Sequence, residues 1–275
     1  MKSYDELTIQ DDFMFGKVMQ DINNLRPLLE RIFPEIDFTG LKLVMPQMAM
    51  NEYYESHGIR VDIFTEDNEH VFSVEMQVAK KVDLPKRTRY YQAVMDMHDL
   101  VKGERYAALR KQYIIFICPG DPFDDNIMVY TYRNVCEETE EELGDGTEKI
   151  FINCSGKNAE EYPLLRPFAE YVNGKESEDG YILQLEKCVR EAKMNPLWRK
   201  EFMDLREKLY LEREEGREEG WKKGKEEGRA EGLSEGLAMR NEQLIRSLSR
   251  KGKSPEEIAD LLDLEIEKVN AVMNS

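Results

Sequence analysis

The stretch IRVDIFTEDNEHVFSVEMQV, from Ile59 to Val78, decides the fold of this chain. Its two ends, Ile59 to Thr65 and Val71 to Val78, are rich in β-branched and aromatic residues, which favours two strands. The polar segment EDNEH at positions 66–70 lies between them and predicts a turn. We therefore expect an antiparallel hairpin.

Three polar side chains of this hairpin are candidates for a catalytic site. Because side chains alternate between the faces of a strand, Glu75 and Gln77 share one face, and pairing places Asp62 opposite them at about 5 Å. Two carboxylates this close repel each other unless a cation lies between them. Mg²⁺ takes such oxygen ligands and can activate water against a phosphodiester. The alternative is that Asp62 and Glu75 belong to the solvent face of an amphipathic hairpin.

The segments on both sides of the hairpin predict an α/β fold, a mixed sheet flanked by helices. In chain order, we expect a helix over Asp11 to Phe33, a strand over Leu41 to Met50, the hairpin, a helix over Leu84 to Val101, strands over Tyr113 to Cys118, Ile127 to Tyr132 and Ile150 to Asn153, and two more helices.

A basic segment follows the hairpin and is a candidate phosphate contact. Within Lys80 to Arg89 the positive residues are Lys80, Lys81, Lys86, Arg87 and Arg89. Arg87, Tyr90 and Tyr91 are spaced i, i+3 and i+4, so we expect them on one helix face, where tyrosines can pack on sugar or base. The alternative is that the tyrosines belong to the core and the charges to a solvated face.

Four stretches of the chain resemble the Rpn family of recombination-promoting nucleases, also described as PD-(D/E)XK nuclease family transposases. They are IRVDIFTEDNEHVFSVEMQV, KRTRYYQAVMDMHDLVKGERY, YIIFICPGDPF and the opening DDFMFGKVMQDINNLRPLLERIF. The resemblance covers roughly residues 8–135. It rests on the ordered set of D, ExQ, RxxYY, GxxY and an apolar strand.

This resemblance implies a restriction-endonuclease-like fold and DNA cleavage that depends on Mg²⁺ or Mn²⁺. Asp62 and Glu75 would be the metal ligands. Gln77 would stand where the superfamily more often has Lys, and it would orient the attacking water without supplying charge. Asp12, or less favourably Asp11, would add an acid from the first helix, although both also suit helix caps. His57 precedes the hairpin, and a lone loop histidine of this kind is most often incidental.

Composition limits the partners of the chain. It has 275 residues, 56 Asp and Glu against 39 Lys and Arg, and a formal net charge of −17. An acidic chain is a poor generic binder of polyanions, so DNA contact needs a local basic patch or bridging metal ions. We see no apolar run of the length that a membrane span needs and no closely paired cysteines, so we expect a cytoplasmic protein with reduced thiols.

The C-terminal part has a different composition, and we predict three domains: 1–195 as the nuclease-like domain, 196–250 as a charged helix or linker, and 251–275 as a small module. Glycine recurs every fourth residue from Gly216 to Gly236. This segment is either a flexible charged linker or, over 210–240, a helix through which copies self-associate. The end predicts two short helices in a helix-turn-helix-like module, beginning at a capping box at Ser254.

Two functions follow from these observations. The first is a Mg²⁺-dependent DNA endonuclease of the recombination-promoting, transposase-like type, with Asp62 and Glu75 at its centre. The second is a catalytically weak or inactive regulatory protein on the same fold, which binds DNA or protein and acts through its helical tail.

Overall fold

A computed structural model describes residues 2–42, 45–50, 59–80 and 82–274, and for 45–50 and 59–60 it describes the backbone alone. His57 and Lys81, which the sequence analysis named, lie outside the described residues. The chain divides into two compact units, Met1–Phe202 and Met203–Ser275. The predicted division into three domains stays a prediction.

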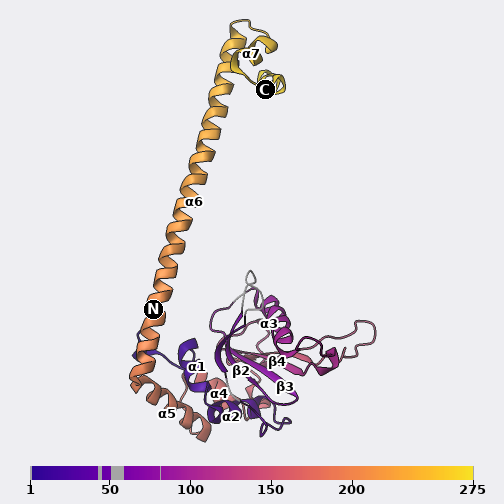
Figure 1. The fold of residues 1–275 in the computed structure, drawn as a ribbon, viewed down its shortest axis with the longest axis vertical. Helices are drawn as coiled ribbons and strands as arrows, with labels where there is room; N and C mark the ends of the chain where they lie inside the picture. Colours follow the sequence, from indigo (N-terminus) through magenta and orange to yellow (C-terminus); the bar gives the residue numbers. More distant parts are fainter. Residues whose placement is uncertain (1, 43–44, 51–58, 81, 275) are drawn as a thin grey trace. The chain divides into compact units, whose positions relative to one another are not determined.

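A six-stranded sheet is the centre of the first unit (Figure 1). Its strands in spatial order are β1 (Met45–Met50), β2 (Ile59–Glu66), β3 (His70–Met76), β4 (Lys111–Cys118), β6 (Thr147–Asn153) and β5 (Val129–Tyr132). The strands β1, β2 and β3 pair antiparallel, β3, β4 and β6 pair parallel, and β5 pairs antiparallel with β6. The predicted mixed sheet is confirmed.

The turn between β2 and β3 is fixed by one aspartate. The Asp67 side chain accepts hydrogen bonds from the backbone N–H groups of Glu69 and His70, each at 2.7 Å. Such a side-chain cap is the usual means by which Asp stabilises a tight turn. The predicted hairpin therefore forms, and its register pairs Ile63 with Val74.

Helices cover both faces of the sheet. On one face, α3 (Leu84–Asp99) packs over the buried rings of Phe116 and Phe151. On the other face, Phe33 and Phe38, which follow α2 (Ile22–Ile32), contact the ring of Phe72 at 6.1 and 5.5 Å. The central strand β4 therefore buries both of its faces, which explains its continuous apolar run.

The predicted single helix over Asp11 to Phe33 is wrong, because the structure divides it into α1 (Asp12–Met19) and α2. The division falls at Asp21, whose side chain accepts a hydrogen bond from the backbone N–H of Asn23 at 2.9 Å and so starts a new helix. The apolar residues keep a helical spacing on both sides of Asp21, so the pattern did not indicate that one helix ends and another begins there.

The remaining helices of the first unit are α4 (Arg166–Val172), α5 (Gly180–Met194) and three 3-10 helices at Tyr4–Glu6, Tyr106–Ala108 and Ala159–Glu161. Of these, α5 packs against α1 and α2. The Phe202 ring lies 5.5 Å from the ring of Tyr4 and 5.3 Å from the ring of Phe13. The Tyr4 hydroxyl donates to the carbonyl of Ala192 at 2.7 Å. These contacts pack the beginning of the first unit against its end.

Gly156 permits two loops at the ends of β4 and β6 to touch. A Cβ at this position would lie 2.6 Å from the backbone nitrogen of Met128. We expect Gly156→Ala to lower the free energy of unfolding by about 2 kcal/mol, because backbone atoms would have to shift. Urea denaturation measures this. The control is Gly40→Ala, since no atom lies within 4 Å of a Cβ there; equal losses in both variants would contradict the argument.

The helix α6 (Pro196–Arg250) has 55 residues and runs on through the glycine repeat. A Cβ added at any of these glycines would meet nothing within 4 Å. Each interior glycine costs up to about 1 kcal/mol relative to Ala. Exposed ion pairs such as Lys222–Glu218 and Lys223–Glu227, spaced i and i+4, offset part of that cost. Of the two alternatives for this segment, a charged helix or a linker, the structure has the long helix.

A small helical module ends the second unit. Its helices α7 (Pro255–Leu262) and α8 (Ile266–Met273) bury Ile258 and Val269 against Ile245 of α6. The predicted capping box is present, because the backbone N–H of Glu257 donates to the Ser254 hydroxyl at 3.3 Å. Within the described residues, no helix has the length and apolarity needed to cross a membrane.

Candidate active site

The two predicted carboxylates lie where the β2–β3 ladder ends. The backbone N–H of Asp62 donates to Oε1 of Glu75 at 2.9 Å, and the backbone N–H of Met76 donates to Oδ2 of Asp62 at 3.0 Å. Each carboxylate therefore accepts a hydrogen bond from the strand that carries the other. This exchange brings Asp62 and Glu75 together, as the hairpin register predicted.

Burial and charge act strongly on Glu75, which is only 4% exposed. Desolvation, and then the charge of Asp62, raise the pKa of Glu75 well above its usual range; the charge of Asp12 adds to the rise. The hydrogen bond from the Asp62 backbone and the charge of Arg87 act in the opposite direction. The pair therefore resists full ionisation unless a positive charge joins it.

Gln77 lies beside this pair and is held by Arg87. Nη1 of Arg87 donates to Oε1 of Gln77 at 2.7 Å, and Nη2 donates to the Tyr91 hydroxyl at 3.1 Å. The guanidinium lies 5.5 Å from the ring centre of Tyr91 and 5.8 Å from that of Phe116. Phe116, which sequence reasoning did not single out, thus forms part of the site; its register partner in β3 is Glu75.

The predicted face of Arg87, Tyr90 and Tyr91 is divided. Tyr91 is 6% exposed and accepts a hydrogen bond from Arg87, whereas Tyr90 is 40% exposed. A step of three residues turns a helix about 60° back and a step of four about 40° forward, which separates the two tyrosines. Desolvation, followed by the charge of Glu75, raises the pKa of Tyr91, and its hydroxyl stays neutral at ordinary pH.

Three other basic residues of the predicted segment, Lys80, Lys86 and Arg89, lie at the surface. Lys86 and Arg89 are exposed on α3, and Lys80 pairs with Asp124 at 2.5 Å. Asp124 belongs to the loop after β4, in which Asp121 accepts hydrogen bonds from the backbone of Phe123 and Asn126. Lys80 therefore lies beside the loop after β4, and Lys86 and Arg89 lie on the exposed side of α3.

The acids of the first helix differ in what they contact. Asp11 occupies the N-cap position of α1, but its carboxylate accepts hydrogen bonds from Thr8 and Lys2 and makes no cap bond to the helix. Asp12 is exposed, and its charge reaches Glu75. The structure therefore places Asp12, and not Asp11, in electrostatic reach of the carboxylate pair.

The donor set fits a hard divalent ion that keeps most of its own water. Among the described residues, no three His, Cys, Asp or Glu side chains gather as a complete metal cage. Mg²⁺ does not require one, since it binds through one or two carboxylates and completes its shell with water and substrate phosphate. Asp62 and Glu75 supply that number of carboxylates, and a bound cation would offset the burial and the charge of Asp62 that raise the pKa of Glu75.

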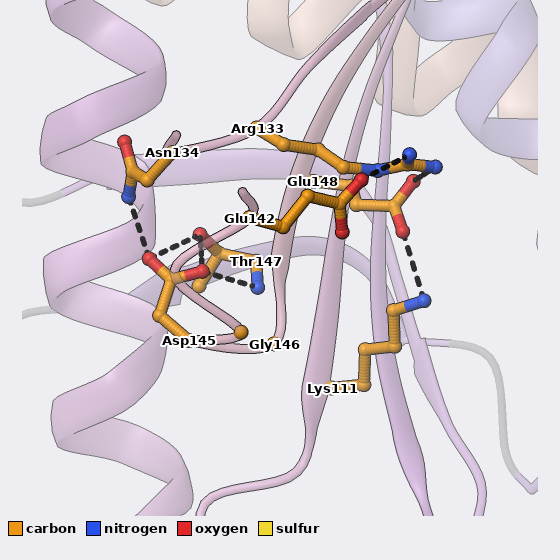
Figure 2. Close-up of a pocket in the computed structure, with 9 residues that line it drawn as sticks. Lys111, Arg133, Asn134, Glu142, Asp145, Gly146, Thr147 and Glu148 are labelled. Carbon is orange, nitrogen blue, oxygen red and sulfur yellow. Dashed lines mark hydrogen bonds and ion pairs between the residues drawn. The ribbon is translucent and has the colours of Figure 1, made fainter. Parts of the chain in front are cut away.

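The position of the carboxylate pair in the sheet favours it as the active site over a cavity elsewhere in the first unit. Glu75 lies near the carboxyl end of β3, the edge at which open sheets with parallel strands bind ligands. A cavity of about 220 Å³ opens at the opposite strand ends. Figure 2 shows its charges paired with one another: the Glu148 carboxylate accepts from Lys111 at 2.8 Å and from Arg133 at 3.2 Å. These pairs fix the loop before β6 to the sheet.

Comparison with known proteins agrees with this geometry. The family model described as PD-(D/E)XK nuclease family transposase matches residues 11–163, more than half of the chain. The chain belongs to the PD-(D/E)XK nuclease family transposases. No curated protein and no solved structure matches it.

The matched region includes every candidate residue of the site, from Asp12 to Tyr91. The resemblance seen in the sequence is thereby confirmed, and so is the restriction-endonuclease-like fold class. Nucleases of the PD-(D/E)XK class generally use divalent metal ions, and membership supports a nuclease-like function with DNA binding.

Proposed function

We propose that this PD-(D/E)XK family protein is a DNA endonuclease that hydrolyses phosphodiester bonds with the help of Mg²⁺. The observation that carries the proposal is the pair formed by half-buried Asp62 and buried Glu75, each hydrogen-bonded to the other's strand. Both carboxylates would hold the ion, and the bound ion would polarise the phosphate and lower the pKa of its water. Gln77 and Arg87 line the same site.

The surrounding cations would hold the DNA backbone. Lys80, Lys86 and Arg89 are exposed near the candidate site, and Tyr90 presents a ring for contact with sugar or base. Contacts of this kind read no sequence, so the proposed cleavage has little sequence preference. A role in recombination and self-association through the 210–240 helix belong to the same proposal, the latter supported by the exposed glycine row of α6.

Removal of the metal is expected to stop cleavage. Supercoiled plasmid incubated with the protein in Mg²⁺ or Mn²⁺ should become nicked, and the same mixture in excess EDTA should stay supercoiled, because the carboxylate pair alone carries no Lewis acid. Gel electrophoresis separates the two forms. Nicking that persists in EDTA would reject the metal-dependent mechanism. A DNA complex that is stable in EDTA and not cleaved when Mg²⁺ is added would favour the regulatory function.

A further inference from the structure

Gln77 is already occupied by two internal hydrogen bonds. Its Oε1 accepts from Arg87, and its Nε2 donates to the carbonyl of Ala79 at 2.5 Å. An amide has two lone pairs and two hydrogens, so one of each remains. The direction of the amide is nevertheless fixed, because its oxygen faces the guanidinium. This arrangement suits a residue that holds a cation in place.

Gln77, Tyr91 and Phe116 all contact the guanidinium of Arg87, and none of them carries a charge that would neutralise it. The Gln77 amide and the Tyr91 hydroxyl, which accept hydrogen bonds from it, are both neutral. The rings of Tyr91 and Phe116 border the guanidinium at 5.5 and 5.8 Å. A rigid, half-buried guanidinium loses little entropy on binding and matches two phosphate oxygens at once.

Its position relative to the carboxylates decides what this charge can do. Arg87 stands one turn from Tyr91 on α3, above Phe116, whose register partner is Glu75. Arg87 is also close enough to Glu75 for the two charges to interact. A phosphate bridged to a metal ion at Asp62 and Glu75 would therefore lie next to the guanidinium.

We propose that Arg87 is the phosphate-contacting cation of this site and that Gln77 is the residue that positions it. The inference rests on the proposed function and deepens it. The positive charge that the superfamily more often carries on Lys, at the position of Gln77, comes here from the neighbouring helix. Gln77 then acts through Arg87, and orientation of the attacking water is not its main task.

The test is a set of substitutions at the two positions, measured first as binding of a short DNA duplex in Ca²⁺. Arg87→Met should weaken binding about 10- to 100-fold, because one charge-assisted contact is lost. Gln77→Met should weaken it less, and adding it to Arg87→Met should change nothing further. Losses that multiply in the double variant would overturn the inference, because Gln77 would then act independently of Arg87.

The most decisive test is a substitution that should have opposite effects on DNA binding in two backgrounds. Gln77→Lys should reduce binding in the wild-type background, where it places a second cation beside Arg87, and should increase binding in the Arg87→Met background, where it restores the missing charge. A purely structural role for Arg87 predicts no such rescue. Arg190→Met, on the exposed face of α5, is the matched control and should bind like wild type. Thermal unfolding of every variant shows whether it is folded.

The same variants separate this inference from the proposed function. In Mg²⁺, Arg87→Met should lower kcat about 100-fold with a smaller change in KM, and Arg87→Lys should recover part of it. If the wild type cleaves DNA and the losses of binding at Gln77 and Arg87 are additive, only the inference that Gln77 positions Arg87 is rejected. Binding that depends on Arg87 and is restored by Gln77→Lys, without any wild-type cleavage, would reject only the endonuclease. Wild-type protein that does not bind the duplex in Ca²⁺ would overturn the assignment of Arg87.

Discussion

Glu75→Gln and Asp62→Asn are each expected to lower metal-dependent plasmid nicking by about 10³-fold or more. Polarisation of a phosphate by a bound metal is worth several kcal/mol of barrier, and each 1.4 kcal/mol is a factor of ten in rate. Both substitutions are isosteric and keep an oxygen that accepts the backbone hydrogen bond now made at 2.9 or 3.0 Å. They therefore remove a metal ligand's charge and leave the end of the hairpin intact.

Nicking is measured from the loss of supercoiled plasmid over time at fixed protein concentration. Lys102→Gln, which changes an exposed charge beyond the end of α3, is the control and should cleave as wild type does. If Glu75→Gln nicks DNA at the wild-type rate, the carboxylate pair does not carry the reaction. A contaminating nuclease would give that result too, and repeating the purification of the variant with the wild type separates the two explanations.

Divalent ions are expected to stabilise the wild-type protein and not Glu75→Gln. Burial, and then Asp62, raise the pKa of Glu75 in the folded state. A group with a raised folded-state pKa contributes its full stability below its unfolded pKa and loses it as the pH rises toward the folded value. Metal-free wild type should thus lose stability relative to Glu75→Gln as the pH rises from about 4 to neutrality and above.

Bound metal removes this penalty. An ion that binds the folded state alone adds about 2.7 kcal/mol to the free energy of unfolding at one hundred times its Kd. Denaturant unfolding at neutral pH, with and without Mg²⁺, measures the difference for both proteins. Equal stabilisation of wild type and Glu75→Gln would place the ion elsewhere. If the two metal-free proteins have the same free energy of unfolding at every pH from acid to neutral, ionisation of Glu75 does not destabilise the folded state.

The hairpin and its carboxylate pair could be predicted from the sequence because both depend on short-range rules. Alternation along β2 and β3 determines which side chains share a face, and the turn at Asp67 determines the register. Those two facts bring Asp62 to Glu75. The family resemblance then supplied the chemistry of the pair and the class of fold.

Other features depended on contacts that spacing does not encode. The bond between Arg87 and Gln77 joins a helix to a strand, and its existence follows from how α3 lies over Phe116. The strand β6 begins at Thr147 and not at the predicted Ile150. Its first three residues are polar, so the apolar pattern did not indicate a strand there. Its Glu148 is tolerated at the buried position because Lys111 and Arg133 pair with it.

The short strand β5 has a consequence for the behaviour of the protein at high concentration. It has four residues, Val129–Tyr132, and occupies an edge of the sheet. A free edge offers unpaired N–H and C=O groups to strands of other molecules, and an edge this short offers few of them. The chain then turns back on itself, with Val135 bridged to Glu142. This edge is thereby protected against strand addition and aggregation.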